Sequence, residues 1–279
     1  MRKSLVMATV LVLFALPCAW GQANSAARRT PLGTPTPFPI QQLLDAQKNK
    51  NKTSTPTPLE PVAQVLDRAV NAHGGRQNLK NVADSVSDGT FTTYTVTGEK
   101  QAYPLTVLGK GEGKMQRVIK QSGGELRQGS DGFDTWDGFA GHHTAILGPA
   151  LSFLEAQTVR SVSKFFDYQA RGARMRDGGM KEQNRVVEIE ETNGRTTTYF
   201  LSPSGRVAKM EFITGQGRNM LTGKPVPIVE SYEFSDYRNV QGVLIPFTIG
   251  HFRNGLKLDV TEFTSVRHNT GVANDVFRP

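Results

Sequence analysis

The sequence contains only one cysteine, Cys18, and it lies in the N-terminal apolar segment. A single thiol cannot form an intramolecular disulfide, and a thiolate zinc site needs several. If the N-terminal segment is cleaved off, the mature chain has no thiol at all. Disulfides, cysteine metal sites and cysteine nucleophiles are then excluded for the mature chain, and its fold must be held together by an apolar core.

The sequence also lacks an apolar run long enough to span a bilayer. The run at residues 5–16 follows two basic residues and precedes small residues that suit cleavage after Gly21 or after Ala23. We interpret residues 1–23 as a cleaved signal peptide and expect export to the periplasm or cell envelope. Two alternatives stay open: an uncleaved membrane anchor, and a lipid-anchored N-terminus at Cys18, for which the preceding proline is a poor fit.

A strong excess of one charge is missing too. The formal net charge of +8 is small for 279 residues, and the basic residues are spread along the chain apart from small clusters such as Arg171, Arg174 and Arg176. No basic stripe with interleaved aromatic residues indicates a nucleic-acid interface. Contact with anionic lipid head groups is compatible with this charge.

Motifs for catalysis and metal binding are absent as well. His142 and His143 are adjacent, so in a strand they point to opposite faces, and the other histidines form no pair at ligand spacing. Asp131, Asp134 and Asp137 lack the glycine and glutamate of an EF-hand loop. The sequence has no G-x-S-x-G nucleophile motif and no complete P-loop. We therefore predict no metal, no cofactor and no enzymatic activity, with a hydrolase of unrecognised site as the remaining alternative.

What the sequence does contain begins with a linker and a helix. Residues 24–59 are rich in proline, threonine and lysine, as in KNKNKTSTPT, and bury too little apolar surface to offset their ordering entropy. We predict a disordered linker there and a folded domain over residues 60–279. The domain opens with a helix whose apolar stripe includes Val65 and Ala69 and which ends at a Gly-Gly pair. His73 lies in its last turn, where a helix end favours a partial positive charge.

Most of the remaining sequence alternates apolar and polar residues and is enriched in β-branched and aromatic residues. Turn signals, including Asn-Gly pairs at 193–194 and 254–255, separate successive segments, so we predict eight to ten antiparallel strands joined in hairpins. If each Asn-Gly pair forms a two-residue turn, the register of both hairpins follows. The predicted pairs are Ile189 with Thr198, Val187 with Phe200, Ile249 with Val260 and His251 with Leu258.

One segment, residues 151–168, breaks the strand pattern. Its apolar residues fall on two adjacent helical rows, which predicts an amphipathic helix inserted into a β protein. A broad meander must curl because its twist accumulates. With only two helices available, the economical arrangement is an α+β fold, mainly antiparallel β, in which a curved sheet wraps around the helices.

The second helix either covers the sheet directly or acts as a lid. Direct packing would make the apolar side chains a core, whereas a helix that stands off the sheet would leave a cavity for an apolar ligand. Each buried methylene of such a ligand contributes about 0.8 kcal/mol, so an acyl chain could be held without catalysis. The candidate cavity residues are Phe153, Leu154, Val162, Phe165 and Phe166 from the helix and Val187, Ile189, Ile245, Phe247 and Ile249 from the sheet.

Four stretches occur in a recognisable order. They are KMQRVIKQSGGELRQGSDGFDTWDGFAG, TTYFLSPSGRVAKMEF, YEFSDYRNVQGVLIPFTI and the final NDVFRP. In this order, over most of residues 60–279, they resemble the LolA/LolB-like superfamily of lipoprotein carriers of the bacterial envelope. Ser130-Asp131-Gly132 and Trp136 stand where that family has its SDGKTLW-type hairpin.

The resemblance implies an unclosed half-barrel with helices in its mouth as a lid, a hydrophobic cavity for acyl chains, and a role in outer membrane lipoprotein sorting. It also makes Arg117 the candidate for the family's lid-locking arginine. We therefore predict a non-enzymatic envelope protein that carries or binds a lipid or a lipoprotein acyl chain. The alternative is a structural or protein-binding envelope module that docks a partner through a sheet face or edge.

Overall fold

The computed structural model describes residues 61–279 except 112, 140, 146–153, 155, 157–164 and 220. The described residues belong to one unit, Pro58–Pro279. The predicted signal peptide and linker lie outside the described residues and stay predictions. Within the described part of the chain, no helix combines the length and the apolar character needed to cross a bilayer.

The described chain opens with helix α2 (Val62–Ala72), as its apolar stripe predicts, and Val65 in this stripe is fully buried. Gly74 follows with φ 110° and leads directly into helix α3 (Gly75–Lys80). A Cβ atom at Gly74 would lie 2.1 Å from the carbonyl oxygen of Gly242, so the close approach of the two backbones requires glycine. The end of α2 and the turn at Gly242 are thereby held together.

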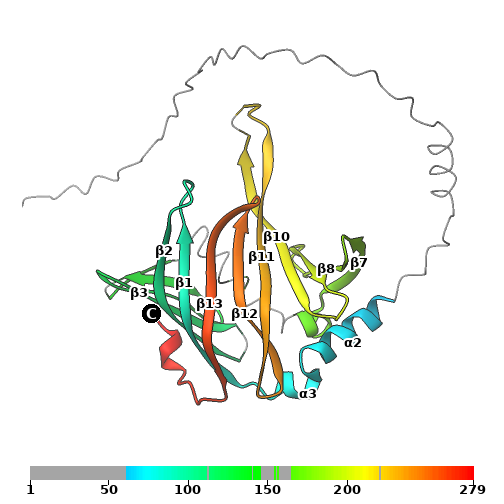
Figure 1. The fold of residues 1–279 in the computed structure, drawn as a ribbon, viewed down its shortest axis with the longest axis horizontal. Coiled ribbons are helices and arrows are strands. Elements are labelled where there is room, and N and C mark those ends of the chain that lie inside the picture. Colours follow the sequence, from blue (N-terminus) through cyan, green and yellow to red (C-terminus); the bar gives the residue numbers. More distant parts are fainter. Residues whose placement is uncertain are drawn as a thin grey trace, which may run out of the picture. The chain divides into compact units, whose positions relative to one another are not determined.

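All strands of the described residues form one antiparallel sheet of thirteen strands (Figure 1). The order is β6-β5-β4-β3-β2-β1-β13-β12-β11-β10-β9-β8-β7, so β6 and β7 are the two edges and the sheet is not closed. This confirms the predicted fold class, a curved unclosed half-barrel with few helices. The strand number exceeds the predicted eight to ten because short or glycine-rich strands such as β6 and β7 carry weak sequence signals.

The strands are β1 Asp84–Tyr94, β2 Lys100–Lys110, β3 Lys114–Gln121, β4 Gly124–Asp131, β5 Thr135–Phe139, β6 His142–Ala145, β7 Arg174–Lys181, β8 Asn184–Glu190, β9 Thr196–Leu201, β10 Val207–Arg218, β11 Pro225–Val240, β12 Val243–Arg253 and β13 Leu256–His268. Two 3-10 helices, η1 Tyr168–Arg171 and η2 Asp275–Phe277, complete the described elements. Consecutive strands pair as hairpins except β6 and β7, and β1 pairs with β13 to join the two halves of the chain.

The register predicted for the β12–β13 hairpin is wrong beyond its turn. Asn254 and Gly255 both have positive φ, 49° and 80°, as a two-residue turn requires. A bulge next to the turn then leaves Leu258 unpaired, so His251 faces Asp259 and not Leu258. Ile249 accordingly faces Thr261 and not Val260. The extra residue moves β13 from Asp259 onward by one position relative to the prediction.

The β8–β9 hairpin differs from its prediction by one residue as well. Its loop holds three residues between Glu191 and Arg195, and the N–H of Glu191 donates a hydrogen bond to the carbonyl of Arg195 (2.8 Å). Only Gly194 in this loop has positive φ, 80°, which is typical of three-residue hairpin loops. The observed pairs are therefore Ile189 with Thr197 and Val187 with Tyr199.

The core lies on one face of the sheet, which we call the inner face, and it packs against the helices. Tyr199 and Tyr232 are the largest of its fully buried side chains. Helix α2 is fixed at the β9–β10 turn, where Arg68 donates a hydrogen bond to the carbonyl of Pro203 (2.7 Å). One cluster joins Val65, Leu66, Ala69 and Val70 of α2 with Leu154, Phe165, Phe166, Val187, Ile189, Tyr199, Met210, Tyr232 and Ile249.

The last described residues pack against the opposite, outer face of the sheet. Phe277 in η2 is fully buried, and its carbonyl accepts a hydrogen bond from the indole Nε1–H of Trp136 (3.0 Å). The side-chain amide of Gln116 donates to the carbonyl of Val276 (2.7 Å). Through these contacts the final NDVFRP segment anchors the end of the chain on β3–β5.

Replacing Phe277 with alanine tests this anchor. Phe277→Ala should lower the free energy of unfolding by about 3–5 kcal/mol, because a fully buried aromatic ring is lost. The measurement is urea unfolding followed by tryptophan fluorescence. The matched control is Phe133→Ala, whose ring is 94% exposed and whose removal should change stability by less than about 0.5 kcal/mol. Equal stability of the two variants would contradict the anchor.

Candidate functional site

A cluster of charged side chains crosses the inner face where β11, β12 and β13 are neighbours. His251 lies between two carboxylates, with Nδ1 2.8 Å from Asp259 Oδ2 and Nε2 3.0 Å from Glu230 Oε2. The guanidinium of Arg253 also contacts Glu230, at 2.6 Å. His251 and Glu230 are buried, and the ring of Tyr232 stacks on the imidazole at a centroid distance of 4.4 Å.

The bulge in the β12–β13 hairpin assembles this cluster. It places His251 directly opposite Asp259, while the β11–β12 register sets Glu230 opposite Arg253 and Tyr232 opposite His251. The predicted register put Leu258 in the place of Asp259 and therefore missed the cluster. A histidine and an acid on adjacent strands of one hairpin were the signal in the sequence, and only the position of the bulge decides whether they meet.

His251 is held as an imidazolium by its two neighbours. Burial by itself would lower the pKa of His251, but the hydrogen bonds and charges of Asp259 and Glu230 outweigh burial and raise it. Burial would raise the pKa of Glu230, and His251 and Arg253 together lower it. The four groups therefore carry two negative and two positive charges that compensate one another.

Arg117, the candidate lid-locking arginine, is buried beside this cluster. Its Nε donates to Gln128 Oε1 at 2.9 Å, and its guanidinium lies 4.9 Å from the ring centre of Phe91. Burial lowers the pKa of Arg117 to about 10, although the nearby charge of Asp259 opposes this change. Arg117 therefore stays charged near neutral pH, and its role toward a lid remains a prediction because most of residues 151–164 lie outside the described residues.

The charged groups of the cluster form ion pairs and hydrogen bonds with one another, which gives the cluster a structural role. Glu230, His251 and Asp259 are paired, so none of them is available as a free base. Among the described residues, no three His, Cys, Asp or Glu side chains gather in a way that could hold a metal ion. The arrangement neutralises buried charge in the middle of the inner face, beside an apolar surface.

An apolar recess lies on the inner face beside α3 and the β2–β3 turn, and we call it the inner recess. Its volume is about 340 Å³, at the small end of the range for ligand pockets. Polar side chains in its wall include His73, Asp84, Lys110, Lys114 and His268. Its apolar wall includes Val107, Met115, Phe234, Ile245, Ile249 and Phe263.

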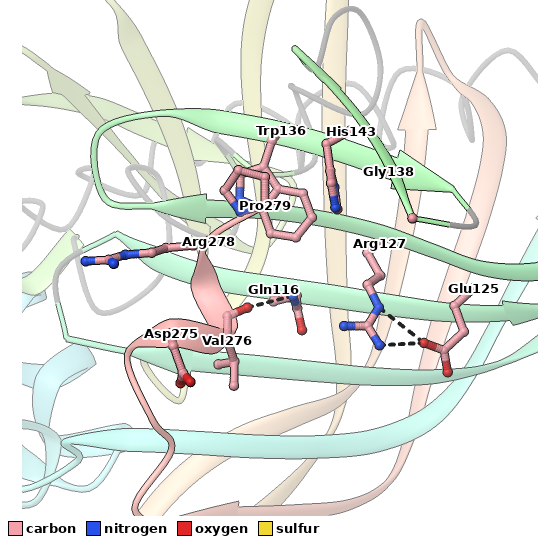
Figure 2. A pocket seen from close by; sticks show the side chains of 11 residues that line it. Gln116, Glu125, Arg127, Trp136, Gly138, His143, Asp275, Val276, Arg278 and Pro279 are labelled. Atoms are coloured by element: carbon pink, nitrogen blue, oxygen red, sulfur yellow. Dashed lines mark hydrogen bonds and ion pairs between the residues drawn. The ribbon is translucent and has the colours of Figure 1, made fainter.

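Another recess, of about 500 Å³, lies on the outer face between β3–β6 and the C-terminal residues (Figure 2). Its wall is largely polar, and Arg127 in it already forms an ion pair of 2.7 Å with Glu125. Gln116 uses its amide to hold Val276, as the dashed line in Figure 2 marks. This recess surrounds the docked C-terminal segment and offers little apolar surface to an acyl chain.

Known proteins can be compared with this arrangement of sheet, helices and recess. No family model matches the sequence, and no curated protein matches it either. Solved structures do match: a putative outer membrane lipoprotein-sorting protein domain from Vibrio parahaemolyticus has a TM-score of 0.53 at 14% identity and covers 78% of this chain and 97% of its own. The fold is LolA-like.

Two further structures support the same fold. A LolA superfamily protein from Nitrosomonas europaea has a TM-score of 0.51 at 12% identity and covers 79% of this chain and 99% of its own. A DUF1329 family protein from Desulfovibrio piger has a TM-score of 0.50 at 12% identity and covers 78% of this chain and 98% of its own. At such low identity the likeness establishes the LolA-like fold and leaves the function to be argued from the site.

The LolA-like fold distributes the predicted cavity residues over three places. Ile245 and Ile249 line the inner recess. Phe247 lies apart from it, with the guanidinium of Arg238 4.3 Å above the centre of its ring. Phe153 and Val162 lie outside the described residues. Leu154, Phe165, Phe166, Val187 and Ile189 are buried in the core cluster and do not line the inner recess.

Within the predicted helix at 151–168, the described residues Leu154, Ala156, Phe165 and Phe166 are α-helical, Asp167 lies in a turn and Tyr168 begins η1. Phe165 packs against Tyr199 at a centroid distance of 4.7 Å, and Phe166 packs against His73 at 5.4 Å. Ala156 lines the inner recess. The segment therefore contributes both to the core and to the boundary of the recess.

The raised pKa of His251 predicts a pH dependence of stability. The contribution of the protonated imidazole is complete below the ordinary pKa of about 6.5 and is lost as pH rises through the higher pKa of the folded state. Urea unfolding at about pH 6 and about pH 9 should thus show wild type losing more stability than His251→Phe. The control His142→Phe, at an exposed position of β6, should lose as much stability between the two pH values as wild type does. If His251→Phe also lost as much stability as wild type, the assignment of the raised pKa to His251 would be refuted.

Proposed function

We propose that the protein carries or binds an apolar ligand of the cell envelope, such as an acyl chain of a lipid or a lipoprotein, and catalyses no reaction. The observation that carries the proposal is the inner recess. It has an apolar wall, it lies on the inner face of an open sheet, and the described helical residues leave it unfilled.

The size of the recess sets the kind of ligand. A water molecule occupies about 30 Å³ of liquid, so 340 Å³ corresponds to roughly eleven groups of that size. One short acyl chain, or the end of a longer one, matches this volume. Because each buried methylene contributes about 0.8 kcal/mol and association itself has a cost, the ligand is held weakly enough to be released.

The LolA-like fold supports the same proposal. One of the matching structures is described as a putative outer membrane lipoprotein-sorting protein domain. A signal peptide over residues 1–23 would place this chain in the periplasm or cell envelope, where such ligands occur. The linker over 24–59 would tether the domain, and its basic residues would favour an anionic membrane surface.

The alternative function, docking of a partner by strand addition, is less favoured by the sheet edges. Edge strand β6 has four residues, and edge strand β7 carries the exposed basic residues Arg174 and Lys181. Short and charged edges discourage the addition of another strand. A bulge between Asp177 and Gly179 interrupts β7 further.

Filling the inner recess tests the proposed function. Val107 is half-buried in the recess wall, so Val107→Trp should block the recess and weaken binding of a fluorescent apolar probe about tenfold or more. The control Val96→Trp makes the same change at a side chain that is 87% exposed and should bind like wild type. Thermal unfolding of both variants checks that the fold persists.

Native mass spectrometry of the purified protein provides the second readout. Wild type and Val96→Trp should retain acyl lipid that solvent extraction removes, and Val107→Trp should not. Failure of delipidated wild type to bind any apolar probe would contradict the proposed function. Equal binding by both tryptophan variants would place the ligand somewhere other than the inner recess.

A further inference from the structure

Two histidines in the wall of the inner recess have unpaired ring nitrogens. Nε2 of His73 and both ring nitrogens of His268 are buried and make no hydrogen bond with the part of the chain that the structure describes. The two residues are only 1% and 6% exposed. Buried polar atoms without partners cost free energy and are uncommon, so each one calls for an explanation.

The fold holds both histidines against one turn. The backbone carbonyl of His73 accepts a hydrogen bond from the N–H of Leu244 (3.2 Å), and the N–H of His268 donates to Oε1 of Gln241 (2.9 Å). Gln241 and Gly242 form the β11–β12 turn with φ 50° and 85°. Chain segments from opposite ends of the domain therefore deliver the two imidazoles to the same recess.

The hydrogen-bonding capacity of His73 is fixed by its other nitrogen. Its Nδ1 lies 2.8 Å from the carbonyl oxygen of Ala69, which can only accept, so Nδ1 carries the proton. Burial lowers the pKa of His73, and the charge of Arg206 lowers it further, so the ring is neutral at about pH 7. Nε2 is then a lone-pair acceptor that requires a donor.

His268 is neutral as well, because burial lowers its pKa more than the charge of Asp84 raises it. A neutral imidazole has one donor and one acceptor, and both are unpaired here. The charged groups nearby are engaged elsewhere. Asp84 accepts from the backbone of residues 270–272, and Lys110 and Lys114 donate to Val272 and Asn274.

We propose that the inner recess takes an uncharged amphiphile whose hydroxyl group lies between the two imidazoles, donating to Nε2 of His73 and accepting from His268. The inference rests on the proposed function and adds the chemistry of the ligand's head. A hydroxyl supplies both a donor and an acceptor, which the two rings require together. A carboxylate or phosphate has no proton for His73 and would lie near the carboxylate of Asp84.

The probes are 1-decanol, decyl methyl ether and sodium decanoate, each with a chain near the recess volume. Titrated into delipidated full chain, 1-decanol should bind about tenfold tighter than its methyl ether, since the ether cannot donate to His73. His268→Phe should weaken binding of the alcohol and the ether alike, because both oxygens accept from His268, whereas His73→Phe should reduce the preference itself, because the hydroxyl loses its acceptor. The control His142→Phe, at an exposed position of β6, should keep it.

Imidazole nitrogen chemical shifts in wild type provide a readout that does not depend on a variant. 1-Decanol should change the chemical shift of Nε2 of His73 while Nδ1 of His73 stays protonated. The ether should leave the chemical shift of Nε2 unchanged. Equal affinity for all three probes, or tightest binding of decanoate, would overturn the inference while the proposed function stands. Binding of none of the three by wild type would instead overturn the proposed function.

Discussion

The pairing of β1 with β13 is the constraint on which the rest of the structure depends. It joins the β1–β6 half of the chain to the β7–β13 half, with Ser85 opposite His268 at one end and Thr93 opposite Asp259 at the other. Because twist accumulates across so many strands, the joined sheet curves and gains an inner face. A bulge at Gly89 adds to the bend, and there a Cβ atom would lie 2.1 Å from the carbonyl oxygen of Glu262.

The curved inner face is used in three different ways. On the β8–β11 side, α2 and the helical residues around Phe165 fill it with a core. In the middle, Glu230, His251 and Asp259 form a buried cluster whose charges compensate one another. Beside α3 the described residues leave the apolar surface uncovered, and this surface forms the inner recess. The tightly packed side supplies the sheet with its core, so the recess beside α3 does not deprive the sheet of packing.

The sequence predicted the local helices and turns well, and it predicted the register in which the strands pair less well. The apolar stripe of α2 is buried as expected, and the Asn254-Gly255 turn forms with the expected geometry. The register of the same hairpin was wrong by one residue, and in a strand that error exchanges the faces. Of the predicted cavity residues, the structure puts Ile245 and Ile249 in the inner recess, and it packs Phe165 and Val187 in the core.

The sequence by itself determined the class of the protein: a mainly antiparallel sheet with few helices, built from hairpins and without a motif for catalysis. Those features follow from local periodicity and turn chemistry, which neighbouring residues decide. Only the tertiary structure decided that His73 and His268, at opposite ends of the domain, face one recess and that His251 meets Asp259. Such contacts depend on a single unpaired residue in a bulge and on the pairing of distant strands, which local sequence patterns do not encode.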